Sequence, residues 1–321
     1  MSSSCVTTTI STCMAVLLLG CAPAIKSTAP GPMTPRQMAE FWENVDPRSR
    51  ELFHGVAGSR VQPDPEGVFE QKRIDTMGFS ITYDVEDESG VEWSVKVGDE
   101  AQSEVTASRL VWAMGYRQVP NTYVARWHLR NGEAKRLMEG ARFRPKLPTL
   151  TSAETWSWQQ NPFVGTQAYR GLIVLMMILN STDLKTDNNA IYERRDGDRV
   201  VGRWYVVKDL GATLGTTGKI DPKRNDIGAF EQHGFITGVR HGRVEFAYRG
   251  RHQELLERVT LDDVAWMCRR LSRLTPAQWK DAFRAGGYVE DVASRYIRRI
   301  QQKVADGLAL TGTPRRAGAA S

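Results

Sequence analysis

The segment that most constrains this chain is a short polar loop, Thr182–Asn189, which reads TDLKTDNN and follows an apolar run. Within it, Asn188 comes five positions after Asp183. A second acidic residue, Asp209, follows the strand-like run Arg203–Val207 and begins the tripeptide DLG. Aspartate and asparagine are also common in ordinary turns, so the loop gains meaning only together with the rest of the chain.

Phosphoryl transfer requires the side chains that this loop contains. A carboxylate orients the attacking hydroxyl and accepts its proton, a cation lies near the transferred phosphate, and an amide oxygen helps to hold Mg²⁺. Asp183 would then be the base and Lys185 the cation, while Asn188 and Asp209 would bind Mg²⁺. The alternative is a structural turn without a catalytic role.

An upstream strand supplies a further candidate, Lys96. Apolar and polar residues alternate along Glu92–Val97, so Lys96 points away from the face that its two neighbouring valines share. A helix is predicted at Ser103–Tyr116, with Glu104 in its first turn as the expected partner and Glu100 as the second choice. The alternative is an exposed strand lysine and a glutamate that is favoured by the helix dipole.

Three segments resemble motifs of the protein-kinase-like superfamily. Thr182–Asn189 resembles the catalytic loop Asp-Leu-Lys-x-x-x-Asn, Asp209-Leu210-Gly211 resembles Asp-Phe-Gly, and Glu92–Val97 resembles the strand Val-Ala-Ile-Lys. Ser181-Thr182 replaces the usual His-Arg, no Ala-Pro-Glu is present, and Thr76–Ser80 is the nearest match to a glycine-rich loop. The chain therefore resembles the atypical HipA-type, phosphoinositide-kinase-like and secretory-pathway kinases.

This resemblance implies a phosphotransferase that uses ATP and Mg²⁺. Lys96, fixed by Glu104, would hold the α- and β-phosphates of the nucleotide. Asn188 and Asp209 would hold Mg²⁺, with the base and the cation as assigned above. The acceptor stays open among protein, lipid, sugar and small molecule.

Two other functions compete with this one. A catalytically inactive, pseudokinase-like binding module at the cell envelope is favoured by the missing glycine-rich loop and by an export signal that would send the chain where ATP is scarce. The charged positions of the motifs are all present, which opposes that reading. Nucleotidyl transfer is a third possibility.

The N-terminus predicts export and lipidation. Residues 14–20 are apolar and end at Cys21, and Leu18–Cys21 resembles a bacterial lipobox. Residues 1–20 would be a signal peptide, and a lipid on Cys21 would anchor the chain to the periplasmic or outer surface of the envelope. The apolar run is too short to span a bilayer. Residues 1–13 contain no Lys or Arg, unlike ordinary export signals, so a cytoplasmic protein is the alternative.

Charge and cysteine content narrow the partners. The net charge of +6 favours anionic partners such as nucleotides, acidic peptides or lipid headgroups. Basic residues are not interleaved with aromatic ones in stripes, so no nucleic-acid module is expected. After cleavage only Cys21 and Cys268 would remain, which leaves Cys268 without an intrachain partner.

The pattern of periodicities predicts an α+β chain, and the resemblance implies a two-lobed, protein-kinase-like fold. Alternating strands are expected before residue 147 and mostly helices after it. The predicted units are a tether at 21–33, a helical extension at 34–66, a small sheet-plus-helix lobe at 67–147, a mostly helical lobe at 148–310 and a disordered tail at 311–321.

Overall fold

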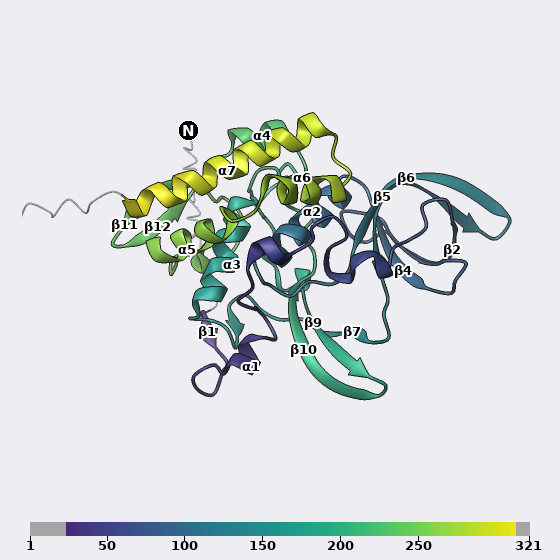
Figure 1. The fold of residues 1–321 in the computed structure, drawn as a ribbon, viewed down its shortest axis with the longest axis horizontal. Coiled ribbons are helices and arrows are strands. Elements are labelled where there is room, and N and C mark those ends of the chain that lie inside the picture. The colour runs from purple at the N-terminus through teal and green to yellow at the C-terminus, as the bar shows by residue number, and fades with distance from the viewer. Residues whose placement is uncertain (1–23, 313–321) are drawn as a thin grey trace, which may run out of the picture.

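The computed structural model describes residues 24–312, and these form a mixed α+β structure, as predicted (Figure 1). The predicted signal peptide, the lipidation site Cys21 and residues 313–321 lie outside the described part of the chain. Among residues 24–312, no helix combines the length and apolar character that crossing a lipid bilayer requires.

Five strands close into a barrel in the order β2-β3-β4-β6-β5. Their bounds are β2 Val68–Asp75, β3 Thr82–Glu86, β4 Glu92–Val97, β5 Thr122–Asn131 and β6 Ala134–Pro145. Alternate residues point inward and fill the barrel with fully buried side chains, namely Phe69, Val85, Trp93, Val95, Trp127, Leu129 and Phe143. Closure depends on parallel pairing of β2 with β5, which places Val68 opposite His128.

Helix α2 (Glu100–Ala113) follows β4 and is buried along nearly its whole length. It packs against β4, β5 and β6 on one side and against α6 (Pro276–Ala285) on the other. Burial on both sides explains why its sequence has only a weak apolar stripe and why polar residues such as Glu104 are enclosed within the protein.

The C-terminal part is built around α3 (Gln167–Ile178), an apolar helix that is capped by Thr166. Helix α5 (Leu261–Leu271) packs on α3, and the long α7 (Glu290–Gly312) packs on α5 and on the short α4 (Ile227–Gln232). In Figure 1, α7 crosses the upper side of the molecule above α5 and α6.

Two small antiparallel sheets complete the structure. Strands β7 (Leu150–Glu154), β9 (Asn189–Asp196) and β10 (Arg199–Val207) pair in the order β10-β9-β7. Strands β11 (Ile236–Arg240) and β12 (Arg243–Phe246) form a hairpin. Because β9 starts at Asn189 and β10 ends at Val207, the paired strands bring the polar loop before β9 next to the acidic residue after β10.

The N-terminal segment differs from the predicted tether. Strand β1 (Lys26–Ser27) pairs in parallel with β8 (Gln160–Asn161), and Ile25 and Met33 pack against the core. Helix α1 (Pro35–Met38) then begins after its N-cap Thr34, where the pair Thr34-Pro35 predicts a helix start. Residues 24–33 thus form part of the folded unit, because backbone pairing can order a proline-rich segment that has no periodicity of its own.

Several elements are longer or different from their predictions. The sequence predicts a last barrel strand at 141–143 only, but β6 runs over Ala134–Pro145, because its polar first half pairs with β5 in the exposed hairpin. Helix α2 begins at Glu100, three residues before its predicted start at Ser103. The sequence also predicts a short helix at Arg48–Val56, and the structure has short 3₁₀ turns there instead, at Pro47–Ser49 and Gly55–Arg60.

Candidate functional site

Lys96 lies on the outer face of the barrel, opposite the interior face that Val95 occupies. Its Nζ is 2.8 Å from Asp209 Oδ2, 3.0 Å from Glu104 Oε2 and 3.4 Å from Glu100 Oε2. Glu104, the predicted partner, and Glu100, the second choice, thus both contact the lysine. These charges come from strand β4, helix α2 and the segment after β10. We call these four residues, together with the two arginines described next, the Lys96 cluster.

Two arginines of β6 complete the cluster. The side chain of Glu104 is only 1% exposed, and its Oε1 lies 2.9 Å from Arg142 Nε and 2.7 Å from Arg144 Nη2. Arg144 also donates to the carbonyl oxygen of Lys208, at 2.8 Å. Sequence reasoning missed both arginines. In the sequence, Arg142 and Arg144 alternate with Phe143, which indicates that they point away from the barrel interior. Only the pairing of Lys96 with Arg142 across β4 and β6 shows that they lie beside Lys96.

The charges of the cluster favour the ionised forms of Lys96 and Asp209, whereas burial disfavours that of Glu100. Burial opposes the charge on Lys96, but the carboxylates of Glu104 and Asp209 outweigh it and raise the pKa of the lysine above its ordinary value. Burial likewise opposes the charge on Asp209, and Lys96 together with the Gly211 N–H lowers the pKa of this carboxyl to about 2. For Glu100, burial dominates, and its pKa is raised.

Glu100 links the cluster to two further segments. Its Oε2 accepts a hydrogen bond from Ser80 Oγ at 2.9 Å, and its Oε1 lies 3.2 Å from Arg224 Nε. The Arg224 guanidinium stacks 3.7 Å from the centroid of the Phe79 ring. The turn between β2 and β3, the nearest sequence match to a phosphate loop, therefore lies against the chain that follows Asp209.

The loop before β9 is tied to Asp209 by its backbone. The carbonyl oxygen of Asn188 accepts hydrogen bonds from the N–H groups of Lys208 (2.8 Å) and Asp209 (3.0 Å). Asn188 Nδ2 donates to the carbonyl oxygen of Asp183 at 2.9 Å. Two carboxylate oxygens of Asp183 lie 2.9 and 3.0 Å from Lys185 Nζ, and its side chain is 22% exposed. Asp183 is thus held at the surface, next to the buried cluster.

The donor set suits a Mg²⁺ ion that is shared with a phosphate ligand. The Asn188 amide nitrogen is committed to Asp183, which directs its oxygen away from that contact. Asp209 Oδ1 accepts the Gly211 N–H at 3.2 Å, and its Oδ2 faces Lys96. No group of three or more His, Cys, Asp or Glu side chains within residues 24–312 is arranged to hold a metal ion. Mg²⁺ that is bound by one or two protein side chains usually takes its other oxygen ligands from water and from substrate phosphates.

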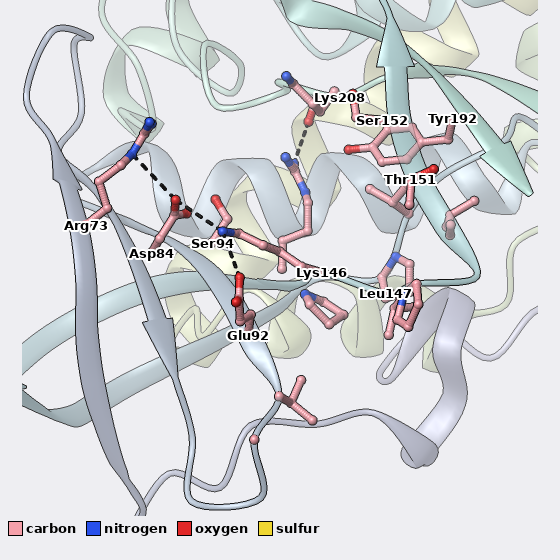
Figure 2. A pocket seen from close by; sticks show the side chains of 18 residues that line it. Arg73, Asp84, Glu92, Ser94, Lys146, Leu147, Thr151, Ser152, Tyr192 and Lys208 are labelled. Atoms are coloured by element: carbon pink, nitrogen blue, oxygen red, sulfur yellow. Dashed lines mark hydrogen bonds and ion pairs between the residues drawn. The ribbon is translucent and has the colours of Figure 1, made fainter. Parts of the chain in front are cut away.

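A cavity of about 1030 Å³ lies between the barrel and the β7-β9-β10 sheet (Figure 2). Apolar side chains such as Val119, Leu147 and Leu150 line it, together with Tyr192. Figure 2 shows a chain of ion pairs along its barrel side, formed by Arg73, Asp84, Lys146 and Glu92, with contacts of 3.6, 3.1 and 3.2 Å.

The cavity reaches the Lys96 cluster indirectly. Arg144 and Lys208 line it, and Arg144 contacts both Glu104 and the carbonyl oxygen of Lys208. Lys96, Asp183, Asn188 and Asp209 are not among the lining residues. Lys96, Glu104 and Asp209 are thus in direct contact, Asn188 and Asp183 are joined to Asp209 through hydrogen bonds, and Arg144 connects Glu104 to the cavity. The volume of the cavity is close to that of small-molecule sites.

Comparisons with known proteins give a weak likeness to solved structures. No family model and no curated protein matches the sequence. A solved structure with a similar backbone is the Helicobacter pylori proinflammatory kinase CtkA, at 8% sequence identity and a TM-score of 0.42, with 77% of this chain and 98% of that chain covered. Neither a family nor an activity follows from a likeness of this degree.

Proposed function

We propose that this chain is an ATP- and Mg²⁺-dependent phosphotransferase of the atypical kinase-like type, with the barrel and α2 as its small lobe. One observation carries the proposal. Lys96 contacts both Glu104 and Asp209, while Asn188 holds the backbone of Asp209, so groups separated by up to 113 residues meet at one place. These are the groups that binding phosphate and a divalent cation requires.

The residues divide the chemistry among them. Lys96 would bind the α- and β-phosphate oxygens, and Glu104 would hold its ammonium group in position. Asn188 and Asp209 would bind Mg²⁺, which supplies positive charge against the phosphates. The cavity lined by Tyr192 would take the base of the nucleotide.

Asp183 would accept the proton of the acceptor hydroxyl. The hydroxyl oxygen then forms a bond to the γ-phosphorus as the bond from that phosphorus to the ADP oxygen breaks. Lys185, which contacts Asp183, would neutralise charge on the transferred group.

A thermal-shift titration tests nucleotide binding. A ligand at a hundred times its dissociation constant stabilises the folded state by about 2.7 kcal/mol, so Mg-ATP should raise the melting temperature. Lys96→Met should abolish the shift, whereas Lys72→Met, at an exposed lysine that pairs with Glu86, should leave it unchanged. The proposal fails if wild type shows no shift. Mass spectrometry of the products separates phosphoryl transfer, which releases ADP, from nucleotidyl transfer, which releases pyrophosphate.

A specific observation favours a catalytically inactive binding module as the second candidate. Three carboxylates already surround Lys96, and Glu100 is also bound by Ser80 and Arg224. Phosphates would have to displace some of these contacts. A Mg-ATP thermal shift without any product, over a range of hydroxyl acceptors, would favour the inactive module.

We further propose that Cys21 carries a lipid that holds the chain at the bacterial envelope. The lipobox-like sequence supports this proposal. Metabolic labelling with a palmitate analogue should mark wild type and not Cys21→Ala. Equal labelling of both would refute the proposed lipid anchor at Cys21 and favour a cytoplasmic protein.

A further inference from the structure

Three basic side chains from segments that contact the Asp183 loop have no counterion among the described residues. Lys219, Arg249 and Arg251, which we call the basic patch, are all exposed. Within residues 24–312, none of the three side chains makes an ion pair or a side-chain hydrogen bond. The cations of the Lys96 cluster, in contrast, are each within ion-pair distance of a carboxylate.

Close packing fixes the two arginines of the patch against the loop. Gly250, which lies between them, approaches the backbone so closely that a Cβ there would be 2.9 Å from the carbonyl oxygen of Thr182. The buried Tyr248 hydroxyl donates to the carbonyl oxygen of Arg251 at 2.7 Å and lies 3.3 Å from that of Thr182. Thr182 is the residue immediately before Asp183.

Lys219 is held at the same place by a second segment. Thr182 Oγ1 donates to the carbonyl oxygen of Gly218 at 2.8 Å and accepts its N–H at 2.9 Å. Thr217 Oγ1 accepts the N–H of Arg249 at 3.0 Å. Three stretches that are distant in sequence therefore meet at Thr182, and two of them have the basic residues of the patch directly next to their points of contact.

The acidic residues of these segments do not neutralise the patch. Asp183 pairs with Lys185, and Glu254 accepts a hydrogen bond from Gln159 at 3.0 Å. Asp221 lines a separate cavity on the side of the β2–β3 turn. The surface beside Asp183 thus has an uncompensated positive charge, which attracts an anionic ligand.

We propose that the basic patch binds the carboxylate side chains of an acidic peptide acceptor and places a Ser or Thr hydroxyl of that peptide at Asp183. This inference rests on the proposed phosphotransferase function and narrows its acceptor. An extended peptide advances about 3.3 Å per residue, so acidic residues near the hydroxyl come within reach of the patch. Arginine binds carboxylates through two parallel hydrogen bonds, which adds selectivity to the attraction.

A membrane surface is the less suitable ligand for the patch. Membrane-binding surfaces combine basic side chains with several apolar ones. In the three stretches that meet at Thr182, the exposed large apolar side chain next to the patch is Ile220 alone. The observations therefore favour a peptide over an anionic bilayer.

Peptide binding can be measured without turnover. Fluorescein-labelled peptides with one central Ser, flanked by Glu, Gln or Lys, are titrated with the full chain in the presence of Mg²⁺ and a non-hydrolysable ATP analogue, and anisotropy is recorded. We expect the Glu peptide to bind at least tenfold more tightly than the Gln peptide. Arg249→Gln/Arg251→Gln should remove this preference. The matched pair Arg126→Gln/Arg136→Gln, at exposed barrel arginines, should change the affinity less than twofold.

Three results would overturn the proposal. Equal affinity for the Glu and Gln peptides would show that the patch does not select carboxylates, and equal losses in the two arginine pairs would reveal a nonspecific charge effect. Binding to vesicles with phosphatidylglycerol that needs Arg249 and Arg251, without peptide selectivity, would assign the patch to lipid headgroups. The Mg-ATP thermal shift of wild type is scored separately, so failure of this inference can be told from failure of the phosphotransferase function.

Discussion

Two neighbouring groups of charges in this protein are arranged in opposite ways. In the Lys96 cluster, Glu104 is buried and has three cationic partners, and Lys96 has three carboxylate partners. In the basic patch, Lys219, Arg249 and Arg251 are exposed and unpaired within the described residues. Asp183 is connected to the cluster through Asn188 and is the next residue after Thr182, which contacts the segments of the patch. The difference separates charges that maintain a fixed geometry from charges that remain available to a ligand.

Asp183→Asn tests whether the reacting hydroxyl lies at the boundary between the two groups. We expect phosphate transfer to fall by roughly 10²–10⁴-fold, since the amide cannot accept the proton, while the Mg-ATP thermal shift is retained. Transfer is measured by release of ADP with the acidic Ser peptide. Asp187→Asn, at an exposed residue of the same loop, is the matched control and should remain active. A fully active Asp183→Asn variant would show that Asp183 is not the base.

Glu104→Gln tests whether the ion pairs of the Lys96 cluster are buried, because it removes the carboxylate that they share. The change leaves Lys96, Arg142 and Arg144 without their shared carboxylate in a buried place, and removing one partner of a buried ion pair costs about 3–5 kcal/mol. Urea denaturation measures the loss in the free energy of unfolding. Glu92→Gln is the control, because Glu92 pairs with Lys146 at the surface and such pairs contribute about 0–1 kcal/mol. Similar losses in both would mean that the cluster is not enclosed.

Ser152→Trp tests whether the nucleotide base binds in the cavity next to the Lys96 cluster. Ser152 lines the cavity beside Tyr192 (Figure 2), so an indole there would occupy the space proposed for the base. We expect the dissociation constant of Mg-ATP to rise at least tenfold, or about 1.4 kcal/mol, with little change in stability. Ser89→Trp, in an exposed turn, controls for the added aromatic ring. Unchanged affinity would place the nucleotide outside this cavity.

Acid titration gives the smallest expected effect. The pKa of Asp209 is lowered from 3.8 to about 2 in the folded protein, so its carboxylate contributes stability above pH 3.8 that is lost as the pH falls through about 2. Glu104, with a lowered pKa, acts in the same direction. Asp209→Asn should therefore lose less stability than wild type between pH 5 and pH 2 in urea titrations. If both lose the same amount, Asp209 does not depend on Lys96 for its charge. Asp198→Asn, in an exposed turn, should behave as wild type.

Local patterns of the sequence predicted much of the structure. Alternation along Glu92–Val97 correctly placed Lys96 on the outer face of its strand. The helices that follow Thr166, Thr260 and Thr275 begin at threonines, a residue type that typically caps helix starts, and each threonine accepts a hydrogen bond from the backbone N–H three residues ahead. These features involve residues a few positions apart, so a short stretch of sequence contains the whole interaction.

The partners of the site residues could not be predicted in the same way. Arg142 acquires its role only because β6 pairs with β4 in a register that sets it opposite Lys96. Arg224 and Glu100 meet across more than a hundred residues. Each of these residues has an ordinary local sequence, and many other registers would satisfy the same alternation of polar and apolar residues.

The sequence by itself thus determined which residues the proposed function uses: the Asp183 loop, Lys96, Glu104 and Asp209. Tertiary structure alone decided that β2 and β5 close the barrel in parallel, that Lys96 has three carboxylate partners, and that Arg249 and Arg251 lie beside Thr182. The physical reason is the range of the interactions. Periodicity and capping act over one or two turns of chain, whereas ion pairs and sheet closure depend on how the buried surfaces of distant segments fit together.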